Sequence, residues 1–226
     1  MKNPLKSFTK TEILLWSISS GLIIAAFLIF DRGSFLNLAA SLVGVTSLIF
    51  CAKGRPTGMV LMIVFSILYG IISFFTAYYG EMITYLGMSM PMSIISLISW
   101  IKNPYSKNEV RVNRIRRREI GLALALTAVI TVGFFFILKY FGTANLIPST
   151  FSVATSFFAV YLTFRRSPLF AAAYAANDVV LIVLWSLAAM NNMKYISVVV
   201  CFAAFLANDI YGFVNWRRMQ KKQCGG

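Results

Sequence analysis

The chain has 226 residues, of which 59% are hydrophobic and only 12% are charged, and its formal net charge at pH 7 is +14. A soluble domain of this length would carry about a quarter charged residues, so the composition excludes an ordinary soluble protein and predicts a polytopic membrane protein. The sequence contains no histidine, the side chain that proton relays and metal sites use most often, and we expect no metal site and no cofactor. The three cysteines lack CxxC spacing and are predicted to be unpaired thiols.

Eight long apolar blocks are predicted to be transmembrane helices. Each is close to the roughly 20 residues that cross a bilayer as a helix, and lipid leaves the backbone of such a block no other way to satisfy its hydrogen bonds. In chain order the blocks cover residues 12–30, 34–52, 57–79, 82–101, 119–139, 147–164, 168–190 and 195–216. No small-residue cleavage motif follows the first block, so we expect a retained helix. Gly87 and Pro91 are expected to loosen the fourth helix.

The distribution of lysine and arginine predicts the orientation of these helices. With eight spans, 18 of the 21 basic residues fall on the side that holds both termini, and only Arg32, Lys139 and Lys194 fall on the other. Basic residues concentrate in cytoplasmic loops, so both termini are predicted to be cytoplasmic. The basic loop Val110–Glu119 would also suit a nucleic acid or a lipid headgroup. We favour topology and attraction to anionic lipid, and predict no nucleic-acid partner.

Two similar loops indicate an internal repeat. The stretches CAKGRPTG (51–58) and TFRRSPLF (163–170) place Pro56 and Pro168 112 residues apart. We predict a three-helix repeat in residues 34–101 and a second, parallel one in residues 147–216. A basic loop and a linker helix (102–146) join them, an N-terminal tail and extra helix (1–33) precede them, and a basic tail (217–226) follows. Parallel repeats of this kind occur in SWEET transporters.

Of the seven acidic residues, only Asp178 and Asp209 are predicted to lie within spans. An ionised aspartate at a helix centre costs about 2.5–3.5 kcal/mol, so such residues usually face a bundle interior or a wet cavity. Asp178 is therefore a candidate site residue. For Asp209 a structural role, hydrogen-bonded to a neighbouring helix, is equally open. Helix rise places the Asn177–Asp178 and Asn208–Asp209 pairs at nearly the same depth.

Helical spacing groups further polar and aromatic side chains around these aspartates. Tyr174, Asp178 and Trp185 share one face of the seventh span, and similar stripes run along the third, fourth and eighth spans. The candidate substrate-binding residues are Trp185, Asp178, Asn177, Asn208, Tyr211, Asn215, Tyr174, Trp100 and Tyr69. Helix packing is an alternative explanation for the hydroxyl stripes, and an aromatic belt for Trp100 and Trp216. No catalytic constellation appears, so an enzyme is not predicted; a passive route for a small polar molecule with an aromatic part fits better.

Several stretches resemble the nicotinamide riboside transporter family PnuC. They are AANDVVLIVLW (175–185), FLANDIYGFVNWRRMQKKQ (205–223), ISWIKNPY (98–105) and EVRVNRI (109–115). The resemblance implies an all-α, eight-helix, SWEET-like transporter in a bacterial inner membrane. It implies uptake of nicotinamide riboside, an NAD precursor, by facilitated diffusion, with cytoplasmic phosphorylation as the trap. It also implies a homo-oligomer, and the family pattern implies a trimer.

With this substrate, the candidate residues receive specific roles. A cation over an aromatic face gains about 0.5–2 kcal/mol, so we expect Trp185, with Tyr174 or Tyr211, against the pyridinium ring. Amides at positions 177, 208 and 215 would bind the carboxamide and the ribose, and Asp178 would balance the charge or orient those amides. Sister families carry thiamine or riboflavin, which stay alternative substrates. A membrane receptor or scaffold with a basic docking loop is the alternative of a different class.

Overall fold

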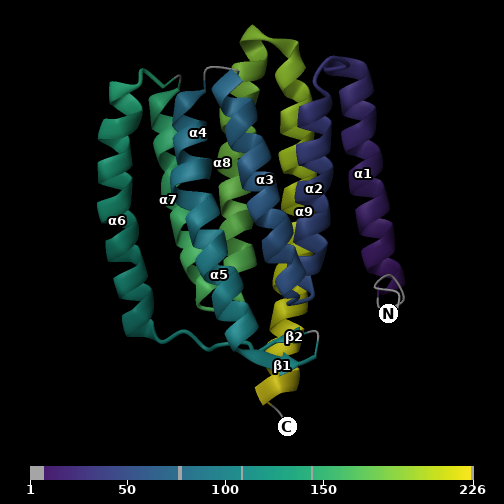
Figure 1. Ribbon diagram of the computed structural model, residues 1–226, viewed down its shortest axis with the longest axis vertical. Coiled ribbons are helices and arrows are strands. Elements are labelled where there is room, and N and C mark those ends of the chain that lie inside the picture. Colours follow the sequence, from purple (N-terminus) through teal and green to yellow (C-terminus); the bar gives the residue numbers. More distant parts are fainter. Residues whose placement is uncertain (1–7, 76–77, 108, 144, 225–226) are drawn as a thin grey trace.

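The computed structural model describes residues 8–75, 78–107, 109–143 and 145–224. In this part of the chain, eight helical segments are long and apolar enough to cross a membrane, as predicted, and they run side by side as one bundle (Figure 1). Six of them are single helices: α1 (Lys10–Phe30), α2 (Phe35–Ala52), α3 (Pro56–Phe75), α6 (Arg117–Tyr140), α7 (Leu146–Phe164) and α8 (Leu169–Asn191). A seventh joins the short 3-10 helix η3 (Met193–Tyr195) to α9 (Ile196–Cys224).

The fourth span is divided into three pieces, α4 (Tyr79–Thr84), a π-helical segment η2 (Tyr85–Ser89) and α5 (Met90–Lys102). Pro91, in the first turn of α5, has no N–H to donate to the preceding turn, and η2 includes Gly87. The predicted loosening of this helix is thus confirmed. π-Helical turns are rare and often occur at functional sites, and η2 contributes Tyr85 and Ser89 to the cavity described below.

The described chain begins and ends at the same end of the bundle (Figure 1). This end, which we call the basic end, carries the α2–α3 loop with Lys53 and Arg55, the α7–α8 loop with Arg165 and Arg166, and the segment between α5 and α6. The opposite end carries the α1–α2, α6–α7 and α8–α9 connections. An even number of spans accounts for this arrangement.

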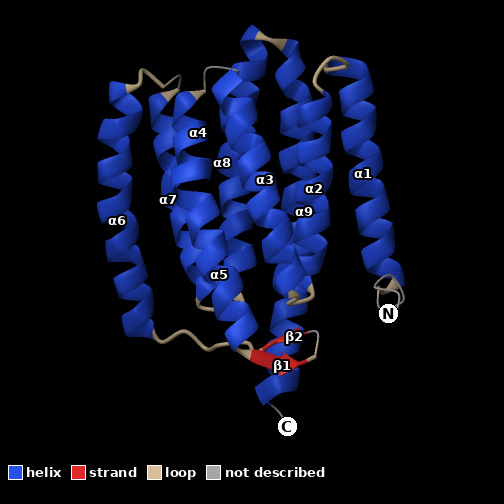
Figure 2. Ribbon diagram, in the orientation of Figure 1, coloured by secondary structure: helices blue, strands red, loops and turns tan. Residues whose placement is uncertain are grey.

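A short antiparallel hairpin of β1 (Pro104–Ser106) and β2 (Glu109–Val110) lies at the basic end, as Figure 2 shows. Helix α9 continues eight residues past the predicted boundary at 216, to Cys224, and reaches the hairpin. There the Gln223 amide donates to Glu109 Oε1 at 2.9 Å and to the Val110 carbonyl at 3.1 Å. The predicted basic tail is therefore helical as far as Cys224 and packs on the hairpin.

The two loops that predicted the repeat have matching backbone geometry. Gly54 and Arg166, 112 residues apart, both have positive φ, at 64° and 55°. The carbonyl of Gly54 accepts from Val110 N at 2.9 Å, and that of Arg166 accepts from Asn113 N at 3.0 Å. One stretch of the α5–α6 segment thus bonds equivalent positions of both loops. These paired contacts support the parallel repeat, which stays a prediction.

The bundle is built around α2, α3, α8 and α9. Helix α9 packs against α8 and α2, α2 packs against α3, and α7 packs against α8. Helix α1 lies outside this group against α2 and α9, and α6 lies at the far edge against α7 (Figure 1). Polar side chains from α3, α5, α7, α8, α9 and η2 meet in the middle of this arrangement.

Candidate functional site

A cavity of about 40 Å³ lies in the middle of the bundle. We call it the central cavity. A water molecule needs roughly 10–15 Å³ of such space, so the cavity has room for a few waters. It would have to widen to admit a nucleoside. The residues that line it are Leu48, Met62, Phe65, Ser66, Tyr85, Ser89, Ser93, Ser156, Tyr174, Asn177, Asp178, Phe202, Phe205 and Asp209.

The polar part of the central cavity comes mainly from α7 and α8. The side-chain oxygen of Asn177 accepts hydrogen bonds from the hydroxyls of Thr155 at 2.8 Å and Ser156 at 2.9 Å. These two donors fix the orientation of the amide and leave its N–H₂ group for other partners. The Ser66 hydroxyl, on the opposite wall, is fully buried and has no hydrogen-bond partner. Buried polar groups are nearly always hydrogen-bonded, so this hydroxyl is available to bond a ligand or a water molecule in the cavity.

Two carboxyl groups line the central cavity together. Asp178 of α8 and Asp209 of α9 are 3% and 4% exposed, and their side chains are near neighbours. Oδ2 of Asp178 is buried and accepts no bond from a hydroxyl, amide or cation. Both aspartates thus line one cavity, and no lysine or arginine is among the lining residues.

Aromatic rings separate the central cavity from the opposite end of the bundle. The ring centroids of Tyr69 and Tyr85 are 4.4 Å apart. Trp185 packs on Tyr69 at 6.3 Å, and on Tyr78 and Tyr195 at 5.0 and 5.3 Å. The Trp185 indole N–H is buried beside the Tyr69 hydroxyl, but the two groups lack the geometry of a hydrogen bond. We call Tyr69, Tyr78, Tyr85, Trp185 and Tyr195 the aromatic cluster.

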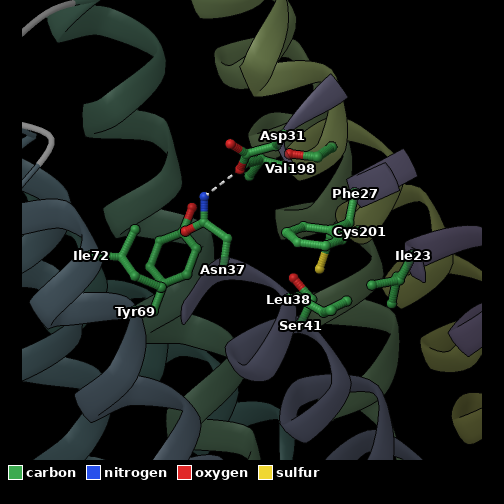
Figure 3. A pocket seen from close by; sticks show the side chains of 11 residues that line it. Ile23, Phe27, Asp31, Asn37, Leu38, Ser41, Tyr69, Ile72, Val198 and Cys201 are labelled. Carbon is green, nitrogen blue, oxygen red and sulfur yellow. Dashed lines mark hydrogen bonds between the residues drawn. The ribbon is translucent and has the colours of Figure 1, made fainter. Parts of the chain in front are cut away.

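Beyond Tyr69 lies a second, smaller cavity of about 20 Å³, shown in Figure 3. Asp31 and Asn37, from the connection between α1 and α2 and the start of α2, stand at its far side and are joined by a hydrogen bond of 2.8 Å. Tyr69 lines this cavity, whereas its neighbour Tyr85 lines the central one. The two tyrosine rings therefore separate the central cavity from this smaller cavity, which lies toward the opposite end.

Two tryptophans close the basic end. The Trp100 indole N–H donates to the Thr163 carbonyl at 2.9 Å, and the Trp216 N–H donates to the Cys51 carbonyl at 2.8 Å. Their rings pack on each other at 5.3 Å and are 1% and 0% exposed. An aromatic belt does not explain residues so deeply buried; each instead joins the last helix of one predicted repeat to the first helix of the other.

Six of the nine predicted site residues do not line the central cavity, and four of these six form contacts elsewhere. Asn208 donates to the Ser19 hydroxyl of α1 at 2.9 Å, and Tyr211 donates to Glu12 Oε1 at 3.0 Å. Asn215 donates to the Ala52 carbonyl at 2.8 Å, and Trp100 lies at the basic end. Of the remaining five, Tyr174, Asn177 and Asp178 line the central cavity, while Tyr69 and Trp185 belong to the aromatic cluster.

Glu12 and Glu81 lie at the ends of two spans and are nevertheless buried. Both are 2% exposed and lie in the first turn of α1 and of α4. Glu12 pairs with Lys53 at 2.7 Å, and Glu81 lies 3.5 Å from the Ser152 hydroxyl. Each sits near the end of a span, where a hydropathy pattern gives no sign of burial.

The predicted site residues did not include Asp209, Tyr85 or the serines of the central cavity. The signal for Asp209 was present: Phe205, Asp209 and Trp216 form the stripe next to Asn208, Tyr211 and Asn215 on α9. Adjacent positions of a helix point about 100° apart. The structure turns the Asp209 stripe toward the central cavity and the Asn208 stripe toward α1 and α2.

Comparisons with known proteins agree with one another on the family and the fold of this chain. A family model described as nicotinamide mononucleotide transporter matches residues 34–218. The nicotinamide riboside transporter PnuC of Neisseria mucosa is 24% identical over 207 residues, which cover 89% of this chain and 79% of that protein. A solved structure, the crystal structure of the vitamin B3 transporter PnuC, superposes with a TM-score of 0.84 at 22% identity, covering 96% of this chain and 94% of that one.

Proposed function

Since the chain belongs to the nicotinamide mononucleotide transporter family, and is a membrane transporter rather than an enzyme, we propose that it takes up nicotinamide riboside by facilitated diffusion. The observation that supports this substrate most is the chemistry of the central cavity. It combines amide and hydroxyl groups, aromatic rings and two carboxyls, without a basic side chain. A nucleoside with a cationic pyridinium ring matches each of these groups.

The same cavity favours the riboside over its phosphorylated form. A phosphate carries up to two negative charges, and inside the central cavity it would meet Asp178 and Asp209 without a lysine or arginine to neutralise it. Like charges in a poorly solvated site repel strongly. The riboside is therefore favoured over its phosphorylated form, and a kinase that phosphorylates it in the cytoplasm would make the product unable to leave by the same route.

We propose that the protein lies in the plasma membrane of a bacterium, with the basic end and both termini on the cytoplasmic side. The support is the distribution of charge, since of the described lysines and arginines only Arg32, Lys139 and Lys194 lie toward the opposite end and such residues are retained on the cytoplasmic side. A homo-oligomer, most simply a trimer, is part of the same proposal. Helix α6, the least buried of the spans, offers a long apolar surface to lipid or to another copy.

A thermal-shift panel tests the substrate. A ligand at 100 times its Kd stabilises the folded state by about 2.7 kcal/mol, which for a protein of this size raises Tm by roughly 5–10 °C. We expect nicotinamide riboside to raise Tm by this amount, and nicotinamide mononucleotide, riboflavin and thiamine to leave it within about 1 °C. Stabilisation by thiamine and not by the riboside would contradict the proposed substrate while leaving the family intact.

A further inference from the structure

The two carboxyls of the central cavity have a chemical consequence of their own. A carboxylate can only accept hydrogen bonds, whereas a protonated carboxyl can donate one. Asp178 and Asp209 are both buried and line the same small cavity, so a hydrogen bond between them requires a proton. With both ionised, two like charges would sit side by side in a buried site, which carboxyl pairs avoid by keeping one proton.

Among the described residues, no lysine or arginine lines the cavity to balance the charge that remains on this pair. The titratable groups nearest to it are the phenols of Tyr85 and Tyr174 and the thiols of Cys51 and Cys201, with Glu81 close to Tyr85. None of these groups can be positively charged. Asp178 Oδ2 and the Ser66 hydroxyl in the same cavity have no hydrogen-bond partner. Buried charges are normally paired, so the missing partner is a group that enters the cavity.

We propose that Asp178 and Asp209 share one proton and act together as the counter-ion of a cationic ligand. The pair then carries a single negative charge, which selects the pyridinium form of the riboside over its reduced, dihydropyridine form. The reduced riboside has nearly the same shape and the same carboxamide and ribose, but no charge. This inference rests on the proposed function and adds to it the feature of the substrate that the site recognises.

Asparagine substitutions separate a shared proton from two independent charges. Asparagine has nearly the shape of a protonated aspartic acid, and its N–H₂ group can donate to the remaining carboxylate. Asp178→Asn or Asp209→Asn alone should therefore reproduce the singly charged pair. Each single variant is expected to retain the preference for the cationic riboside to within about threefold, whereas the double variant should lose at least about tenfold of its affinity for that riboside, because no charge is left to balance it.

The measurement is the affinity of purified protein for nicotinamide riboside and for reduced nicotinamide riboside, by isothermal titration calorimetry. Glu81→Gln removes another buried carboxyl that does not line the central cavity, so it serves as the matched control and should leave the preference unchanged. Thermal unfolding of each variant verifies that it is folded. Wild-type protein, which needs no substitution, should bind the cationic form at least about tenfold more tightly than the neutral form.

The outcomes distinguish this inference from the proposed function. Wild-type protein that binds both forms equally would overturn the counter-ion and leave the riboside as substrate, whereas failure to bind either form would contradict the proposed function itself. A double variant that keeps the preference would also overturn the counter-ion. Single variants that lose as much affinity as the double variant would show that both carboxyls must be charged, and would overturn the shared proton.

Discussion

Replacing Trp185 with alanine is expected to reduce uptake of nicotinamide riboside by at least about 100-fold. The Trp185 ring packs against Tyr69 and Tyr78 between the central cavity and the opposite end, and its N–H is buried without a partner. When the cationic ring passes Trp185 on its way to the central cavity, burial and cation–π attraction together contribute about 3 kcal/mol, and 1.4 kcal/mol corresponds to a factor of ten. Initial uptake rates in proteoliposomes measure the effect.

Two further variants define what the tryptophan contributes. Trp185→Phe keeps an aromatic face and removes the indole N–H, so an intermediate loss of about fivefold to tenfold is expected for one hydrogen bond. Trp16→Ala is the matched control, because Trp16 lies on α1 with 42% of its surface exposed and far from the aromatic cluster. Uptake that is unchanged in Trp185→Ala would remove this residue from the transport route.

Replacing Trp216 with phenylalanine is expected to make the thiol of Cys51 react about fivefold to tenfold faster with a membrane-permeant maleimide. Cys51 is 2% exposed, and its own carbonyl accepts the Trp216 hydrogen bond. Phenylalanine keeps the packing against Trp100 but removes that bond, which is worth about 0.5–1.5 kcal/mol. Losing this free energy should raise the fraction of molecules in which the helices at the basic end separate and expose Cys51. The rate of maleimide labelling reports that fraction.

The second buried thiol supplies an internal control for this experiment. Cys201 is 4% exposed and lines the smaller cavity beyond Tyr69, away from the tryptophan pair. In a Cys224→Ser background, which removes the exposed thiol, labelling of Cys201 should not change. Equal acceleration of both thiols would indicate general loosening of the bundle, and no acceleration of Cys51 would show that the Trp216 bond does not hold the basic end closed.

The fold was largely predictable because the membrane restricts it strongly. A span of about 20 apolar residues leaves the backbone no structure but a helix, and the eight predicted blocks agree with the observed helices to within a few residues at most ends. The largest deviations lie where the chain leaves the apolar region. The third span was predicted to reach residue 79, which is already the first residue of α4. Helix α9 extends to Cys224, because contacts with the hairpin, not hydropathy, determine where it ends.

The candidate site was only partly predictable, because helical spacing gives the faces of a helix but not their direction. Asp178 and Asn177 were identified because a carboxyl in the middle of a span needs a polar environment. On α9, two neighbouring stripes were both polar, and the sequence did not indicate which one faces the cavity. The answer depends on α1, whose Ser19 and Glu12 bind Asn208 and Tyr211 and so turn Asp209 inward. Such contacts join residues about 190 positions apart and leave no local pattern.

Uptake of labelled nicotinamide riboside into liposomes that contain the purified protein tests the central claim most directly. We expect saturable uptake well above that of protein-free liposomes. Excess unlabelled riboside should block it, and nicotinamide mononucleotide or thiamine should not, because the central cavity has two carboxyls and no basic side chain. Uptake no faster than in protein-free liposomes, or uptake that thiamine blocks and the unlabelled riboside does not, would contradict the account.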